Sequence, residues 1–474
     1  MGQSDWVAEP IIFARKRPVL AFSRISPPIM QLGRWLAPLY LRFFLRFQTI
    51  DIAEPQRILE ALNDFQEKRT RLIVAFRHPY GDEPQLIFHV FNNLLPRLAK
   101  RSGRPLRRRP HLRMIHDYAV PLWGDIFIRF ILPRVGSLPV YHVKFDPESL
   151  KRIRGILLDD ACPLGIAPEG QITYHSETLP RIEQGTIRMG FWCARDLEKA
   201  GRPEKTQILP LSIHYRYDRR DLKKIRTSIA RLETLCGLAP DPGRTPVNGL
   251  PGLQSAIVRI ENRVLDSVEA FYKIDTGSRQ QPGGLSGPDE DAVRQQRWEI
   301  LLDAALGQAE RILGLLPGSM DVIQRVYRIR HEGWERIYPE QLDKRLSRIE
   351  RILVHRRAGE AWHAMRHMEF VDLMSYHQTG YLGGSPMAGR SFDRTVESVI
   401  NLEDLVNRLR GGNITTRPNV VRKKAILMAA PCLDLTALLP EYQKNAKDTV
   451  RGAAEELRMR LLNCMEAQNH GTDY

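Results

Sequence analysis

The hydrophobic positions of the first half of the chain alternate between two patterns. Short apolar runs of the kind found in buried strands are followed by segments in which apolar residues recur every three or four positions, as on one face of a helix. The predicted strands cover residues 72–76, 112–115, 137–140, 164–167 and 208–213. The predicted helices between them include residues 85–98, 147–159 and 186–199. This alternation predicts an α/β fold with a mostly parallel sheet and flanking helices.

The pattern changes after Tyr217, because nearly every periodic segment from there on has helical spacing. The predicted helices cover residues 222–236, 253–274, 292–316, 321–337, 341–368, 395–410 and 448–465, and we expect no strand among them. A stretch rich in glycine and proline at 237–252 lies near the change. We therefore expect an α/β domain at 49–220 and a mainly α-helical C-terminal domain, of unassigned role, at 221–474.

The N-terminal segment, residues 1–48, has a different character. Between positions 11 and 50 it carries seven basic residues and no Asp or Glu. A helix over residues 30–47 would place its arginines on one side and its large apolar residues on the other. The basic side comprises Arg34, Arg42 and Arg46, and the apolar side comprises Trp35, Leu36, Leu39, Phe43 and Phe47. Such a helix either lies on an anionic membrane surface or packs on the protein's own core, and the pattern fits both.

Composition narrows the class of protein. The chain has 474 residues, 43% of them apolar, and a net charge of +16, so it folds and its partner is expected to be anionic. Its five cysteines include no closely spaced pair, which favours a reducing, cytoplasmic setting over secretion. No apolar run reaches the length of a membrane span, so we expect at most peripheral membrane association. Seven cations between positions 100 and 113 form either an anion-attracting patch or a solvated loop.

Candidate chemistry is concentrated in the sequence Arg-His-Pro-Tyr-Gly-Asp-Glu-Pro, which follows the first predicted strand. Ligands of open α/β sheets bind in loops at such positions. His78 could act as a general base, with a carboxylate holding its tautomer and stabilising the imidazolium form. Asp82 and Glu83 are both within reach, and Pro84 favours the first turn of a helix. One of the two carboxylates is expected to face His78 and the other to cap that helix.

Three further segments of interest lie at or beside predicted strands. Gly-Ser-Leu-Pro-Val begins at Gly136, Pro-Glu-Gly spans 168–170, and an apolar strand containing Pro210 follows. In this order the four segments resemble the conserved blocks of the glycerolipid acyltransferase superfamily, which includes the lysophosphatidate acyltransferases. The resemblance covers about residues 72–217.

This resemblance implies site residues. It makes His78 the base, Glu83 the carboxylate at the family's spacing, and Glu169 with Gly170 part of the acceptor site. Two arginines of the family are replaced, by His142 in the second block and Ile172 in the third. Since paired guanidinium donors suit phosphate, their loss puts a glycerol-phosphate acceptor in question. The cations that could substitute are Arg134, Lys144, Arg181 and Arg188.

The implied activity is transfer of a fatty acyl chain from acyl-CoA or an acyl carrier protein to a hydroxyl of a lysolipid or similar acceptor. The thioester is a co-substrate, and no further cofactor is expected. His363 and His367 are four residues apart, but without a fitting third ligand we expect no metal there. Expected partners are the acyl thioester, the lysolipid and an anionic membrane surface, with an acidic acyl carrier protein as a further candidate. The alternative is a non-catalytic lipid- or nucleic-acid-binding protein with this fold, and the absence of a recognised nucleic-acid-binding motif disfavours nucleic acid.

Overall fold

The computed structural model divides the chain into two compact units, each described here by itself. Unit one comprises Met1–Val19 and Arg219–Val421, and unit two comprises Leu20–Asp218 and Arg422–Tyr474. We call them the helical unit and the α/β unit. The residues that the structure describes are 11–17, 23–123, 126–141, 147–238, 249–275, 288–316, 321–343, 346–374, 390–409 and 419–470.

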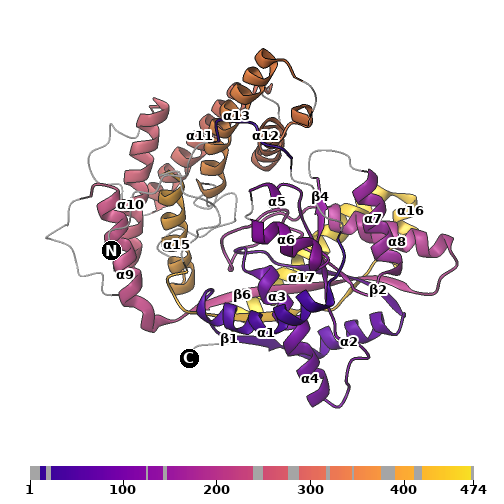
Figure 1. The fold of residues 1–474 in the computed structure, drawn as a ribbon. Coiled ribbons are helices and arrows are strands. Elements are labelled where there is room, and N and C mark those ends of the chain that lie inside the picture. The colour runs from indigo at the N-terminus through magenta and orange to yellow at the C-terminus, as the bar shows by residue number, and fades with distance from the viewer. Residues whose placement is uncertain are drawn as a thin grey trace. The chain divides into compact units, whose positions relative to one another are not determined.

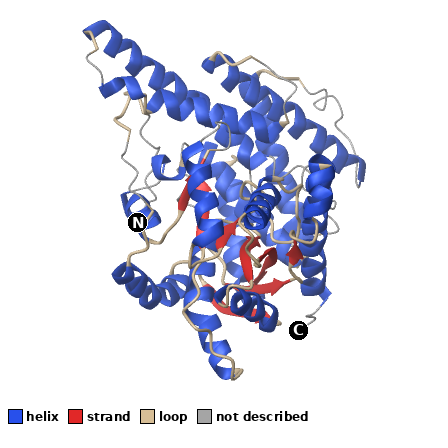
Figure 2. Ribbon diagram, turned by 90° about the vertical axis from the view of Figure 1, so that its right-hand side faces the viewer, coloured by secondary structure: helices blue, strands red, loops and turns tan. Residues whose placement is uncertain are grey.

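The α/β unit is built on an eight-stranded sheet (Figures 1 and 2). Its strand order is β1-β7-β6-β2-β5-β3-β4, and β8 pairs with β6. The strands are β1 (Phe47–Ala53), β2 (Thr70–Phe76), β3 (Arg113–Asp117), β4 (Leu138–Val140), β5 (Leu164–Ile166), β6 (Lys205–Tyr217), β7 (Lys423–Ala429) and β8 (Leu433–Asp434). From β4 to β6 all neighbours are parallel, whereas β7 and β8 pair antiparallel with β6, and β1 pairs parallel with β7. The predicted α/β class with a mostly parallel sheet is confirmed.

The central strand β2 is buried at every position, as expected for a parallel strand covered on both faces. Helices pack over the sheet and cover its strands (Figure 2). Those before β6 are α1 (Pro27–Phe43), α2 (Pro55–Gln66), α3 (Glu83–His89), a π-helical turn (Val90–Leu94), α4 (Leu95–Arg101), α5 (Val120–Trp123), α6 (Ile126–Arg134), α7 (Pro147–Asp159) and α8 (Gly185–Lys199). The C-terminal α16 (Leu439–Lys444) and α17 (Ala446–His470) complete the set. One core cluster joins β2, α8 and α17 through Ile73, Phe191 and Leu457.

Among its described residues, the helical unit has helices and loops but no strand. Short 3₁₀ turns at Arg219–Asp221 and Glu340–Asp343 accompany the longer helices. These are α9 (Leu222–Leu235), α10 (Leu250–Tyr272), α11 (Pro288–Leu313), α12 (Val322–Ile337), α13 (Arg348–Met374) and α15 (Phe392–Leu409). Trp298 and Leu301 of α11 and Ile329 of α12 are almost completely buried.

The division of the chain differs from the expected one at both ends. Residues 221–474 are not one helical domain, because the chain returns to the α/β unit at Arg422 and adds two strands and two helices there. The expectation of no strand after Tyr217 was therefore wrong: β7 lies between β1 and β6, partners more than 200 residues away in the chain. Local periodicity carries little signal for a strand held by such remote pairing.

The segment 1–48 is not a separate region either. Helix α1 packs against α3 within the α/β unit, where Phe88 approaches Gly33 so closely that a Cβ at Gly33 would lie 2.9 Å from Cζ of Phe88. The predicted helix over 30–47 also ends early, at Phe43. Arg46 takes a left-handed backbone conformation, with φ of 58°, and Phe47 begins strand β1 as a buried residue.

Candidate active site

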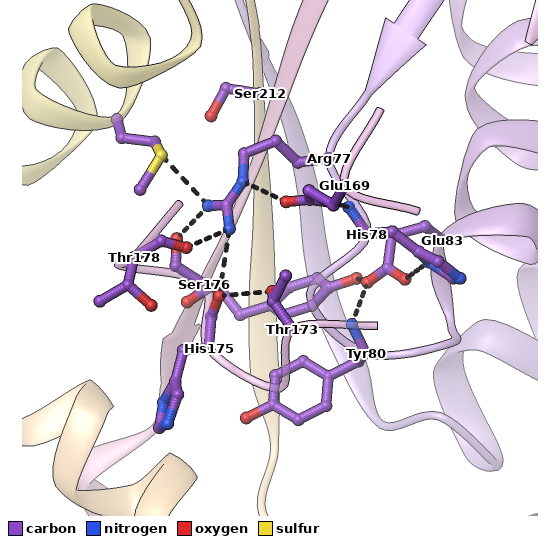
Figure 3. Close-up of polar contacts among 12 residues, drawn as sticks. Arg77, His78, Tyr80, Glu83, Glu169, Thr173, His175, Ser176, Thr178 and Ser212 are labelled. Atoms are coloured by element: carbon purple, nitrogen blue, oxygen red, sulfur yellow. Dashed lines mark hydrogen bonds and ion pairs between the residues drawn. The ribbon is translucent and has the colours of Figure 1, made fainter. Parts of the chain in front are cut away.

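His78 lies in the loop that joins the end of β2 to the start of α3, as the sequence predicted. Its Nδ1 lies 2.7 Å from Oε2 of Glu83 (Figure 3). The side chain of His78 is about one-fifth exposed, whereas that of Glu83 is fully buried. Nε2 of His78 forms no hydrogen bond with the described residues, and a group arriving from solvent could therefore reach it.

The carboxylate of Glu83 is held by four groups. Besides His78, the backbone N–H of Gly81 donates to Oε2 at 2.8 Å, and that of Tyr80 donates to Oε1 at 3.1 Å. The hydroxyl of the buried Tyr215, on β6, donates to Oε1 as well. A carboxylate fixed on both oxygens can hold the imidazole with Nδ1 protonated and Nε2 available as a base.

The sequence left open which carboxylate faces His78, and the structure assigns Glu83. Asp82 occupies the position before α3, but its side chain makes no capping hydrogen bond. It pairs instead with the ammonium group of Lys423, the first residue of β7. The expected helix cap is therefore replaced by an ion pair to a strand that the sequence analysis did not predict.

The local sequence explains the turn. Gly81 has φ of +128°, a conformation that favours glycine, and it lets the chain reverse between His78 and Glu83. Pro84 occupies the second position of α3, where its missing N–H leaves no helical hydrogen bond unmade. The turn thus brings two side chains that are five residues apart into direct contact.

Arg77 is an organising residue that the sequence analysis missed. Its guanidinium group is completely buried, and its Nε lies 3.1 Å from Oε1 of Glu169. Its other nitrogens donate to the backbone carbonyls of Ser176 and Thr178 at 2.6 Å each and of His175 at 3.2 Å, as Figure 3 shows. Since an unpaired buried arginine would be costly, this network fixes the loop that follows Glu169 against the end of β2. The only sequence signal was the position of Arg77 next to His78.

Glu169 lies behind His78. Its second oxygen, Oε2, accepts the backbone N–H of His78 at 2.6 Å, and the residue is almost completely buried. Burial raises the pKa of Glu169, while Arg77 and His78 act in the opposite direction. With both oxygens engaged, Glu169 is placed to position His78, which favours a structural role over the contact with an acceptor that the resemblance implied. Gly170 follows with φ of +75°, as a turn there requires.

The sheet order explains why distant segments meet. Strands β2 and β5 are parallel neighbours, so the His78 loop and the Pro168–Gly170 turn leave the same edge of the sheet. Strand β6, with Tyr215, pairs with β2 on its other side. The second sequence block, which begins at Gly136 and includes β4, does not adjoin β2, because β4 lies at the far end of the sheet, beyond β3.

Two of the candidate cations, Arg181 and Arg188, lie on the described part of helix α8 and the loop before it. Arg181 and Arg188 are exposed, and Arg188 donates to Oε1 of Gln184 one turn earlier. His142 and Lys144 lie outside the described residues. Ile172 does lie near the site, with its Cδ1 3.5 Å from where a Cβ on Gly81 would be.

The charges around His78 change its proton affinity. Burial lowers the pKa of His78, but the hydrogen bond and charge of Glu83, together with the charges of Glu169 and Asp82, outweigh it, so the pKa is raised overall. The thiol of Cys162 is different: burial raises its pKa to about 11, which makes it a poor nucleophile at neutral pH.

No protein-family model matches the chain, and no curated protein matches it. Among the described residues, no helix has the length and apolar character needed to cross a membrane.

Proposed function

We propose that this protein is an acyltransferase that moves a fatty acyl chain from an acyl thioester to the hydroxyl of a lysolipid or a similar acceptor. The observation that carries the proposal is the contact between His78 and Glu83, a base and a buried carboxylate at 2.7 Å in a loop at the end of a parallel strand. The resemblance of the four sequence blocks selects acyl transfer from the reactions that such a pair can serve.

The proposed reaction needs one base and no covalent enzyme intermediate. Nε2 of His78 takes the proton of the acceptor hydroxyl as its oxygen attacks the thioester carbonyl. The tetrahedral intermediate then expels the thiolate as the carbon–sulfur bond breaks, and the imidazolium returns the proton to sulfur. Glu83 stabilises the imidazolium between these steps, while Tyr215 and two backbone N–H groups keep the carboxylate in place.

The donor is acyl-CoA or an acyl carrier protein, both of which carry negative charge. Six of the seven cations in residues 100–113 are exposed, and the seventh, Arg113, pairs with Asp160 at 2.7 Å. An exposed cationic stretch can attract the phosphates of CoA or the acidic surface of a carrier protein. We also propose that the protein works at an anionic membrane surface, where lysolipids reside, attached through α1.

The test is acyl transfer by the purified full chain. Labelled acyl-CoA and acyl carrier protein are incubated with a panel of lysolipids, and the products are separated. The wild-type protein should form acylated lipid, and His78→Ala should reduce the rate by about 10² to 10⁴. His363→Ala, which removes an exposed histidine of the helical unit, is the matched control and should leave the rate unchanged.

The same experiment also distinguishes acyl transfer from the alternative function, lipid binding without catalysis. A protein that binds lysolipids and anionic vesicles but transfers no acyl group from either donor would be a lipid-binding protein with this fold. A folded His78→Ala variant with wild-type turnover would overturn the role of His78.

A further inference from the structure

Two helices of the α/β unit present apolar side chains to solvent. On α1 and at Phe44, the residue that follows it, large apolar and aromatic residues are exposed along one side, including Trp35 at 67%, Phe43 at 70% and Phe44 at 69%. On α6, Ile126 is 83% exposed and Phe127 is 65% exposed. The other exposed members are Leu32, Leu36, Leu39 and Tyr40 of α1 and Phe130 of α6. We call these ten residues the α1–α6 surface.

The inner side of α1 is already occupied. Met30 and Leu41 are buried, Gly33 lies against Phe88 of α3, and the carbonyl of Arg34 accepts the side-chain amide of Asn93 at 3.0 Å. The helix is thus apolar on the side that faces the protein and on the side that faces solvent. The outer face of a helix is usually polar, whereas that of α1 is apolar and is left uncovered by the described residues.

Helix α6 also exposes an excess of apolar side chains. Its sequence, Ile-Phe-Ile-Arg-Phe-Ile-Leu-Pro-Arg, is almost entirely apolar, yet none of its nine residues is buried. Arg129 holds it in place by donating to the carbonyls of Pro121 at 2.7 Å and Leu122 at 3.3 Å. Its position is therefore fixed while its large apolar side chains stay exposed.

The two helices form one surface although they are about 90 residues apart in the chain. They contact each other directly. The strand-like segment that enters α1 is also tied to the end of α6: the N–H of Arg24 donates to the carbonyl of Pro133 at 2.9 Å, and that of Ser26 donates to Arg134 at 2.8 Å. The end of α6 is thereby fixed to the start of α1.

We infer that the α1–α6 surface is where the protein inserts into the headgroup region of an anionic bilayer. This inference deepens the membrane attachment proposed above: it adds α6, which the sequence did not indicate, and names the inserting side chains. Six of the ten residues of the surface are aromatic, and such residues suit the boundary between headgroups and acyl chains. Charge supports a bilayer over a second protein, because α1 and α6 together carry four arginines and no acid, and Arg42 on α1 is exposed beside the aromatic residues.

The test uses the purified full chain and vesicles of phosphatidylcholine with increasing phosphatidylglycerol. Two triple variants remove apolar side chains without touching buried ones: Trp35→Ser with Leu39→Ser and Phe43→Ser on α1, and Ile126→Ser with Phe127→Ser and Phe130→Ser on α6. Each should lower the vesicle partition coefficient at least about tenfold, since burial of apolar area contributes to binding. The control Phe271→Ser removes a phenylalanine that is 69% exposed in the helical unit and should change binding less than twofold.

A second measurement locates the insertion directly. Phe127→Trp in a Trp35→Phe background should show additional quenching by lipids brominated along the acyl chain, relative to the Trp35→Phe chain, which keeps the other six tryptophans. Because the substituted residues are exposed, circular dichroism and thermal unfolding of all variants should match the wild type.

Three outcomes would overturn the inference. One is wild-type vesicle binding by the folded α6 variant, which would remove α6 from the surface. Another is the absence of quenching at position 127. The third is a vesicle-free dimer that both triple variants dissociate, which would identify a second copy of the chain as the partner. Acyl transfer is tested separately in detergent, so a protein that binds vesicles but transfers nothing would contradict the proposed function and leave this inference standing.

Discussion

The ammonium group of Lys423 pairs with the carboxylate of Asp82, a residue 341 positions earlier in the chain. The same ammonium group lies over the rings of Phe47 and Tyr215, at 4.7 and 5.1 Å from their centres. The chain's returning strand β7 therefore reaches the loop that carries His78. Asp82 and Glu83 are neighbours in sequence, but one binds this strand and the other binds the histidine.

We predict that Glu83→Gln and Asp82→Asn separate these two roles. Glu83→Gln keeps the shape of the side chain but removes the charge that stabilises imidazolium, so turnover should fall by about 10² to 10⁴. Asp82→Asn should retain most of the turnover and lose about 1 to 3 kcal/mol of unfolding free energy, because Lys423 is left buried without its carboxylate. Steady-state rates and urea unfolding check the pair. Equal loss of turnover in both variants would contradict this division.

The fall in rate at acidic pH should reflect the protonation of His78. A general base must be neutral, and the surrounding carboxylates raise the pKa of His78 above its ordinary value of about 6.5. The decline of kcat/KM with acidification should therefore begin above pH 6.5. Glu83→Gln removes the principal group that raises this pKa, and the midpoint of its residual activity should move to lower pH. An unchanged midpoint would assign the limb to another group.

The same shift predicts a direction for stability. Because the folded-state pKa of His78 is above the unfolded-state value, folding is favoured when the imidazole is protonated. This contribution is complete below about pH 6.5 and is lost as the pH rises through the folded-state pKa. Comparing the unfolding free energies of wild type and His78→Gln across this range should show a difference that shrinks toward alkaline pH. A difference that grows with pH would contradict the direction of the shift.

Arg77 and Glu169 should behave as a coupled buried pair. Replacing Arg77 by Met leaves the Glu169 carboxylate buried without its guanidinium, which should cost about 3 to 5 kcal/mol. Glu169→Gln in the same chain should recover part of that loss, since no buried charge then remains. A double-mutant cycle of unfolding free energies measures the coupling. Additive effects would show that the two side chains are independent.

Ile172→Arg should change acceptor preference. The side chain at this position lies against Gly81 in the turn of the His78 loop, so an arginine there could offer paired donors to a phosphate. We expect the ratio of rates for phosphate-bearing over phosphate-free lysolipids to rise about tenfold. Arg188→Gln, outside the cluster, serves as the control and should leave the ratio unchanged. The prediction assumes that the wild-type site lacks the paired donors that bind phosphate. A wild-type enzyme already strongly selective for lysophosphatidate would contradict that assumption.

Features that depend on neighbouring residues in the chain could be predicted from the sequence, whereas features that depend on distant residues could not. Strands β2 to β6 were predictable because each is a short apolar run flanked by polar residues, and His78 could be placed because it follows such a run. Strand β7 alternates between buried and partly exposed positions and is held by β1 and β6, which local patterns cannot indicate. Tyr215 and Arg77 were missed for the same reason: their partners, Glu83 and Glu169, are more than 90 residues away.

The late return of the chain also has a consequence for biosynthesis. Strand β1 pairs with β7, so the N-terminal strand of the sheet waits for residues beyond Lys423 before it gains that partner. The intervening helical residues are made in one continuous stretch from Arg219 to Val421, and nearly all of that unit has left the ribosome before β7 exists. The helical unit can therefore fold first during translation, while the His78 loop acquires Lys423 only as the last tenth of the chain emerges.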